Sequence, residues 1–307
     1  MAESTDAQQP GCDKGSSPTI SPKVAPPPFD KLNANLILRS SDWVDFRVRR
    51  GIMEEVSTMF EDMLSIPQPQ GQDNSKDVGY DGDVPIVQLT EHSSVLLPVL
   101  QLCYPGLGSL SVPKDSIVAV YEASRKYMMD WPMKRTLDQL MEWAQTEPYR
   151  VYAIAAKFQS IDLLRFAAKQ TLRFPNSIPY CEEWEDITAG TLHRLIKYRQ
   201  AHVDAMMRQM RSLFIPRHFD DKYMVTFANR LWGTQWVWFG CKSNLFGRLT
   251  NTPAESTIAQ LDIEPILQTA LRCGHCKDRA KGDLESFRTA LEAHLASVYA
   301  SIELEIK

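Results

Sequence analysis

Early in the chain, the pattern of hydrophobic and polar positions changes from the spacing of a strand to that of a helix. Val44, Phe46 and Val48 alternate with charged residues, as in a half-buried strand. The apolar run Leu36–Leu38 precedes them, and the polar segment Ser40–Asp42 between the two runs indicates a turn. We therefore predict a hairpin of two short strands.

The residues after the predicted hairpin have helical spacing. Hydrophobic side chains recur on one face, at Ile52, Val56, Met59, Phe60 and Met63. We predict a single amphipathic helix here. Hairpin and helix together carry no group of residues suited to catalysis, so we expect this segment to be a scaffold for binding.

The chain then alternates between one more strand and several helices. A hydrophilic stretch from about Pro67 to Asp83 predicts a long surface loop. Pro85–Thr90 has a strand pattern and a helix follows, in which we expect Pro98 to lie in the first turn. The next helix, from about Lys114 to Met129, is expected to turn Met128 inward with its other apolar residues.

Helical patterns dominate the remainder of the chain. We predict helices that begin at Pro132 and that span about 149–158, 160–172, 188–213, 256–272 and 281–305, with Ser160 as an N-cap. The predicted organisation is a Pro/Ser-rich disordered tail at 1–28, an α+β domain at 29–145, a helical extension at 146–215, and a mostly helical region at 216–307.

Several motifs of the predicted α+β domain at 29–145 resemble the BTB (POZ) domain in the form common in fungi. The resemblance covers about residues 30–145. The similar segments are Asn35–Asp42 and Val44–Val48 with the family's first two strands, Ile52–Met63 with its first core helix (Ser57 and Phe60 in matching places), Val87–Leu89 with its third strand, Leu102–Gly106 with a helix end, and Tyr121–Met128 with the next helix.

The resemblance implies a small sheet capped by helices and a non-enzymatic role in protein–protein interaction. It implies an adaptor or scaffold, either a substrate adaptor of a cullin ubiquitin ligase or part of a transcription-regulating complex. We expect docking through an apolar helical groove and an exposed sheet edge. The predicted interaction residues are Met59, Phe60, Met63, Tyr104 and Tyr127.

The chain also departs from the family pattern at two places. Many members carry an extra helix before the first strand that exchanges between subunits, whereas Pro26–Pro28 stand there in this chain and cannot form a helix. We therefore expect no dimer formed by such a swap, while self-association by another route stays open. Members that bind cullins often carry a hydrophobic-x-Glu motif after the first core helix, and Ser65–Gly71 contains no Glu.

Composition and charge narrow the function classes. The chain has 307 residues, of which 44% are hydrophobic, enough for two domains with real cores. A net charge of −4 with mixed signs argues against a broad nucleic-acid footprint. The polar N-terminus carries no secretory signal, no apolar run is long enough for a membrane span, and the six cysteines are too scattered for a disulfide framework. These features favour a cytoplasmic or nuclear protein.

A Cys-x-x-Cys motif is the sharpest candidate for chemistry. Cys273 and Cys276 could share a zinc ion with Cys241 and a histidine, although the second ligand pair at short spacing that a strong zinc motif needs is missing. The competing interpretation is a helix that ends near Gly274, with both cysteines packed as small apolar side chains. No other cofactor is indicated.

Two further clusters have a structural and a functional interpretation. The aromatic residues Trp232, Trp236, Trp238 and Phe239 are either the core of a small subdomain or a stacking platform. The methionines of the helix at 188–213 are either core or an adaptable partner surface. No GxSxG, Walker, GxGxxG or HExxH motif occurs. We therefore predict a non-enzymatic adaptor, with a zinc-binding or nucleic-acid-associated regulator as the alternative.

Overall fold

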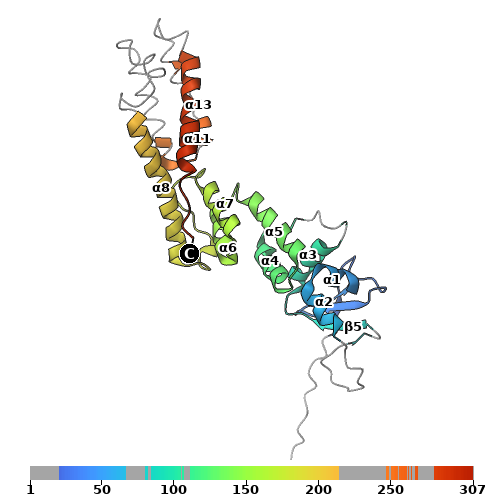
Figure 1. Cartoon of the computed structure of the whole chain (residues 1–307). Helices are drawn as coiled ribbons and strands as arrows, with labels where there is room; N and C mark the ends of the chain where they lie inside the picture. Colours follow the sequence, from blue (N-terminus) through green and yellow to red (C-terminus); the bar gives the residue numbers. More distant parts are fainter. Residues whose placement is uncertain are drawn as a thin grey trace, which may run out of the picture. The chain divides into compact units, whose positions relative to one another are not determined.

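The computed structural model describes residues 21–66, 80–81, 84–104, 106, 111–213, 247–248, 250–254, 256–260, 262, 264, 267–268 and 280–306. The described chain is mixed α+β, as predicted. It divides into two compact units, residues 1–136 and 137–307, which we call the N-terminal and C-terminal units (Figure 1). The division falls within helix α5 (Asp130–Trp143).

The N-terminal unit contains a five-stranded sheet of order β1-β3-β2-β5-β4. Its strands are β1 (Lys23–Val24), β2 (Leu36–Arg39), β3 (Val44–Val48), β4 (Tyr80–Asp81) and β5 (Val84–Gln88). β2 and β3 form the predicted antiparallel hairpin, and β5 pairs in parallel with β2. The sheet therefore joins segments that lie far apart in the sequence.

Two predicted boundaries are wrong. The disordered tail was placed at 1–28, but Lys23–Val24 pair with β3 and Ala25 is buried. The loop was extended to Asp83, but Tyr80–Asp81 pair with β5. Both missed strands have only two residues, too few to show a period, and their pairing partners are remote in sequence.

Strand β3 does not follow the predicted alternation at Asp45. This aspartate is buried although it occupies a polar position of the pattern. Its carboxylate accepts two hydrogen bonds from Arg39, from Nε at 2.6 Å and from Nη2 at 2.8 Å. Because both carboxylate oxygens of Asp45 are hydrogen-bonded, its charged side chain can be buried.

The helices of the N-terminal unit pack beside the sheet. They are α1 (Arg50–Val56), α2 (Thr58–Ser65), α3 (Ser93–Cys103), α4 (Ile117–Lys126) with a 3₁₀ turn before it (Lys114–Ser116), and the first part of α5. The helices at 93–103 and 117–126 and the start of α5 agree with the predicted positions within a few residues.

The single helix predicted across Ile52–Met63 is broken into α1 and α2. Ser57 separates them with an extended backbone, φ −147° and ψ 112°. Its hydroxyl accepts a hydrogen bond from the Phe60 N–H at 3.1 Å, which caps α2. The break shifts the phase of the apolar face, so that Met53 is fully buried while Met59 is exposed.

Two details of the neighbouring helices also differ from expectation. Pro98 lies well past the first turn of α3, where it removes one helical hydrogen bond. Met128 is exposed, because α4 ends at Lys126 and Met128 adopts a left-handed backbone with φ 50°. Met129 takes the buried position instead.

The C-terminal unit is helical in its described residues. Its elements are α6 (Pro148–Phe158), α7 (Ile161–Thr171), a 3₁₀ turn at Glu182–Trp184, α8 (Ala189–Leu213), α11 (Ser256–Ala259) and α13 (Ala280–Tyr299). Most of α6 is buried, which makes it the centre of the unit, and it packs against α7. Ser160 precedes α7 as predicted, but its side chain makes no capping hydrogen bond.

A buried arginine joins α8 to the end of α7. Arg199 is 3% exposed, and its guanidinium donates to the carbonyl oxygens of Thr171, Phe174 and Pro175, the last two at 3.0 Å. It also donates to the side chain of Asn176 at 2.8 Å and lies over the ring of Tyr149, 5.5 Å from its centroid. These contacts hold α8 against the end of α7 and the turn that follows it.

Candidate interaction surface

Two of the predicted interaction residues form a buried pair in the N-terminal unit. Phe60 of α2 is 2% exposed and stacks on Tyr127, with ring centroids 5.5 Å apart and planes at 29°. Ser57 donates its hydroxyl hydrogen to the Tyr127 carbonyl. Since neither ring reaches the surface, this pair fixes α2 on the end of α4 and supports the residues above it.

A charged network holds the hydroxyl of Tyr127. This hydroxyl donates to the carboxylate of Glu91, which also accepts from Nζ of Lys126 at 2.7 Å. Burial and the bond to Glu91 raise the pKa of Tyr127. Desolvation opposes the charge of Glu91, but the hydrogen bonds from Lys126 and Tyr127 outweigh it and lower the pKa of Glu91. At neutral pH the Glu91 carboxylate is therefore ionised, and Tyr127 keeps its proton and donates it in the hydrogen bond.

Tyr104 lies at another place in the unit, at the end of α3. Its ring contacts Phe29 edge-on, with centroids 5.1 Å apart, and its hydroxyl accepts from the Arg49 N–H at 2.9 Å. The residue is half-buried. Tyr104 thus packs at the point where β3 leads into α1. Among the contacts of the described residues, none joins Tyr104 to Phe60 or Tyr127.

Three exposed apolar residues lie on α2, just after α4 and at the start of α5: Met59, Met128 and Trp131. Their exposed fractions are 37%, 60% and 54%. The hydroxyl of Thr58, next to Met59, lies 3.5 Å from the Met128 sulfur, and Trp131 follows at the start of α5. Met63, on α2, is half-buried. We call Met59, Met63, Met128 and Trp131 the methionine–tryptophan surface.

Sequence reasoning missed two members of this surface. Met128 was expected inside, and Trp131 was not singled out. Trp131 directly precedes Pro132 at the beginning of a predicted helix, and this place does not by itself indicate exposure. The left-handed backbone of Met128 also has no local signal, since a non-glycine residue with positive φ is uncommon.

The sheet edges offer little to a docking strand. The two edge strands β1 and β4 each have two residues, and the Arg47 N–H of β3 is taken by the Phe29 carbonyl at 2.8 Å. Short edge strands leave few unpaired backbone groups for strand addition. Of the two predicted docking modes, the helical surface therefore has the better geometric support.

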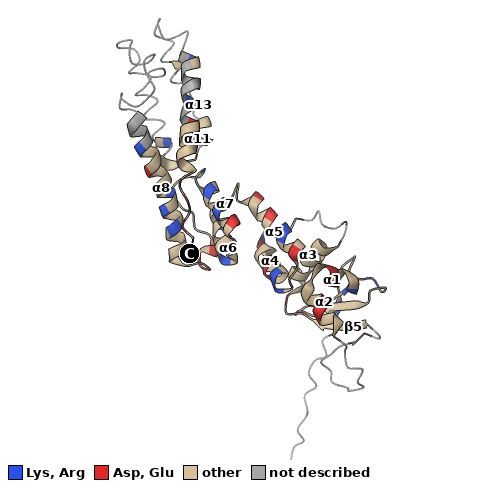
Figure 2. Cartoon of the chain, viewed as in Figure 1, with Lys and Arg blue, Asp and Glu red and all other residues tan. Residues whose placement is uncertain are grey.

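The arginines at the end of β3 are engaged within the unit. Arg47 pairs with Asp81, and Arg50 donates to Glu54 at 2.6 Å and to the Leu64 carbonyl at 2.6 Å. Figure 2 shows Lys and Arg among Asp and Glu on the helices of this unit. The pattern is that of a solvated surface of mixed charge.

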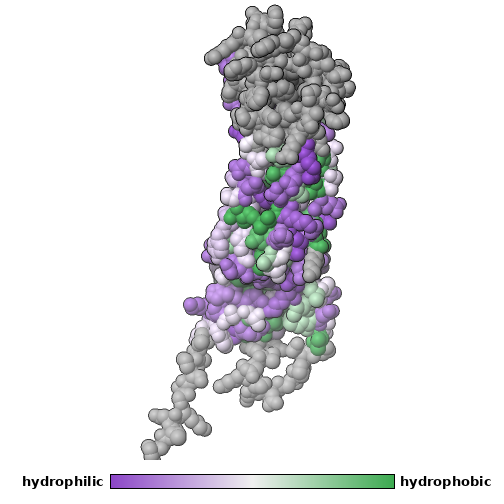
Figure 3. Space-filling view, turned by 90° about the vertical axis from the view of Figure 1, so that its left-hand side faces the viewer, coloured by the Kyte–Doolittle hydropathy of each residue, from purple (hydrophilic) through white to green (hydrophobic). Residues whose placement is uncertain are grey.

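Apolar and polar residues are mixed over the surface as well. On the face drawn in Figure 3, hydrophobic residues form separate groups among hydrophilic ones. Among the described helices, none is both long and apolar enough to cross a bilayer. On this face the apolar residues thus form local groups within a polar exterior.

The predicted zinc ligands Cys241, Cys273 and Cys276 lie outside the described residues, as does the Trp232–Phe239 cluster. In the described ranges, no three His, Cys, Asp or Glu side chains come together as metal ligands would. Two thiols are described. Burial raises the pKa of Cys103 to about 12 and that of Cys181 to about 11, so both are poor nucleophiles at neutral pH.

Comparison with known proteins adds no assignment. No family model matches the chain, and no curated protein matches it significantly.

Proposed function

We propose that the chain is a protein-interaction adaptor whose N-terminal unit is a BTB-type module. The observation that carries the proposal is the methionine–tryptophan surface, in which three large apolar side chains are exposed above a rigid buried support. Trp and Met are enriched at protein interfaces, and a Trp that becomes buried on binding is often a hot spot.

The arrangement of the strands agrees with what the resemblance implies. A hairpin leads into two short helices, and a later strand returns to pair in parallel with β2 before α3 and α4 follow. A small sheet accompanied by helices is what the resemblance implies, and this arrangement supports the proposal to that extent. It does so together with the motifs between Asn35 and Met128.

A cullin scaffold and a transcription-regulating complex are the two candidate partners. Both come from the resemblance. The missing hydrophobic-x-Glu motif removes one contact that cullin-binding members often make, so an affinity in this chain would depend on the methionine–tryptophan surface. Methionine side chains adapt to different partner shapes, which suits such a role.

The proposal is tested by titrating the purified chain with a purified cullin scaffold in a calorimeter. We expect saturable binding that Met128→Glu weakens by at least roughly tenfold, because a carboxylate would be desolvated at the interface. Leu32→Glu is the matched control, since Leu32 is 84% exposed in the same unit but is not part of this surface. Binding that is equally strong in wild type and the Met128→Glu variant would contradict the assigned surface, and no binding would exclude the cullin.

A further inference from the structure

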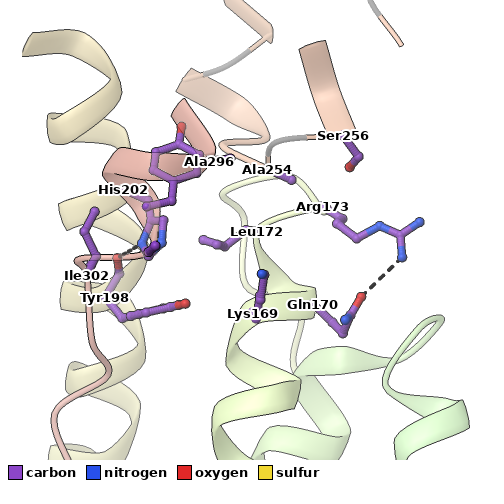
Figure 4. A pocket seen from close by; sticks show the side chains of 12 residues that line it. Lys169, Gln170, Leu172, Arg173, Tyr198, His202, Ala254, Ser256, Ala296 and Ile302 are labelled. Atoms are coloured by element: carbon purple, nitrogen blue, oxygen red, sulfur yellow. Dashed lines mark hydrogen bonds between the residues drawn. The ribbon is translucent and has the colours of Figure 1, made fainter. Parts of the chain in front are cut away.

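The C-terminal unit contains a cavity of about 570 Å³ between α7, α8 and α13 (Figure 4). This volume lies within the range of roughly 300–1,000 Å³ that is typical of small-molecule sites. The lining residues come from the end of α7 and the turn after it, the middle of α8, the segment around Ala254, and the end of α13 with Ile302. Segments from four parts of the chain thus meet at one hollow.

One side of the cavity is a wall of aromatic rings. The ring of His202 lies between those of Tyr198 and Tyr299, with centroid separations of 4.4 Å and 4.9 Å. All three residues are buried. Nδ1 of His202 is 2.9 Å from the Tyr198 carbonyl; since a carbonyl only accepts, Nδ1 carries a hydrogen and the ring is held in place. The wall is therefore rigid and suited to contact a flat ligand.

The side of the cavity formed by α7 carries two cations, Lys169 and Arg173. Both are exposed, and Figure 4 shows Arg173 across the hollow from His202, with its guanidinium 3.2 Å from Oε1 of Gln170. Among the described residues that line the cavity, none is Asp or Glu. The cavity therefore has a positive rim beside its aromatic wall.

Two other cations of the same unit form ion pairs with carboxylates. Lys157 pairs with Asp186 at 3.0 Å, and Lys197 pairs with Glu305 at 2.5 Å. Within the described part of the chain, no carboxylate forms an ion pair with Lys169 or Arg173. Cations near a helix C-terminus also stabilise the helix through its dipole. A test of the cavity must therefore measure ligand binding rather than protein stability.

We propose that this cavity binds a small organic anion in which a flat ring carries a carboxylate or a phosphate. The anionic group contacts Lys169 and Arg173, which supply charge-assisted hydrogen bonds. The ring lies along the wall of Tyr198, His202 and Tyr299. An aromatic carboxylate and a mononucleotide share this chemistry. The site is independent of the interaction surface, so neither proposal depends on the other.

The test is a set of ligand-observed NMR titrations of the full chain with matched probes. The pairs are 2-naphthoate with neutral 2-naphthamide, and adenosine monophosphate with neutral adenosine; inorganic phosphate is added alone. We expect at least one anion to bind saturably and its neutral partner to bind at least about tenfold more weakly. The pair that binds distinguishes the carboxylate from the nucleotide. Phosphate alone is expected to bind more weakly than either ring-bearing anion.

Substitutions place the binding at the cavity. We expect Lys169→Gln with Arg173→Gln to weaken the anion by about tenfold or more. Arg165→Gln, an exposed arginine on α7 outside the lining, should leave binding unchanged. Ala300→Trp should block the exposed lining position and abolish binding. The proposal is overturned if no anion saturates up to ~10 mM, if the neutral probes bind as well, or if the folded double variant binds like wild type.

Discussion

Arg199 and Asp45 are both buried charges, and each is stabilised in a different way. Asp45 has an opposite charge, Arg39, in a two-bond pair. Arg199 instead contacts backbone carbonyls and a tyrosine ring, and among the described residues no carboxylate pairs with it. Desolvation accordingly lowers the pKa of Arg199. Its role is to close the end of α7, on which the cavity is built.

Replacing Arg199 with Met should therefore destabilise the C-terminal unit. The substitution removes the donor of the Phe174 carbonyl, whereas the carbonyls of Thr171 and Pro175 keep the Phe174 N–H and the Tyr149 hydroxyl as donors. A buried unsatisfied group costs about 1–3 kcal/mol, so we expect a loss of about 1–3 kcal/mol in the free energy of unfolding, measured by urea denaturation. The exposed Arg165→Met should change it by less than about 0.5 kcal/mol. Equal midpoints for the two variants would refute this role.

Asp42 provides a pH-dependent contribution to the N-terminal unit. Its carboxylate accepts from the backbone N–H of Ser93 at 2.8 Å and from the hydroxyl of Ser93 at 2.7 Å, at the start of α3. Desolvation alone would raise the pKa of Asp42, but these hydrogen bonds outweigh it and lower the pKa far below its usual value. The folded state thus prefers the ionised form.

A lowered folded-state pKa gives stability that is complete above the unfolded pKa and is lost as the pH falls toward the folded value. Asp42→Asn should cost about 1 kcal/mol at pH 7. The difference from wild type should shrink as the pH falls below ~4. Denaturation midpoints of the two proteins measured from pH 7 to pH 2 test this, with Asp30→Asn as an exposed control. A constant difference over that range would contradict it.

At the scale of elements, Ser57 decides the local fold. It ends α1, begins α2, and connects both to the end of α4 through the Tyr127 carbonyl. The residue is 1% exposed. Because its hydroxyl both accepts and donates, one side chain satisfies two backbone groups that would otherwise be buried without partners.

Ser57→Ala should lower the free energy of unfolding by about 2 kcal/mol, the sum of a lost N-cap and an unsatisfied carbonyl. Ser65→Ala is the matched control, since the Ser65 hydroxyl bonds only to the Asp62 carbonyl at an exposed site. Unfolding curves followed by circular dichroism should distinguish the two variants. If both unfold together with wild type, Ser57 does not hold the helices in place.

The elements that the sequence predicted well are those with a complete local signal. The hairpin and α3 each have several periods of their own, and both are found. What could not be predicted depends on contacts between remote segments. Ser57 breaks the helix because the Tyr127 carbonyl is available to it, and Lys23–Val24 become a strand because the edge of β3 is free there.

The sequence pattern names Met59, Met63, Phe60 and Tyr127 as interaction residues, but it does not tell which of these side chains the fold buries. Phe60 and Tyr127 form a buried stacked pair, whereas Met59 is exposed. The exposed layer depends on the positive φ of Met128, which no local pattern of methionines reveals. Burial in a region where two helices meet is decided by their packing, and a hydrophobic residue at a helix end can face either way.

At the scale of the whole molecule, the two compact units carry two different kinds of candidate site. The N-terminal unit presents an exposed apolar group on a rigid support, whereas the C-terminal unit has a hollow with a positive rim. An adaptor that binds a protein with one unit and a small molecule with the other would link these two binding events. The central claim concerns the first of these sites.

That claim is tested most directly by quantitative affinity purification of the tagged full chain, followed by mass spectrometry. Wild type is compared with a Met128→Glu/Trp131→Glu variant and with the Leu32→Glu control, after circular dichroism has shown that all three are folded. We predict at least one protein that wild type and the control recover and that the double variant loses by at least roughly tenfold. Recovery of the same proteins by all three would contradict the account, as would the absence of any specific partner.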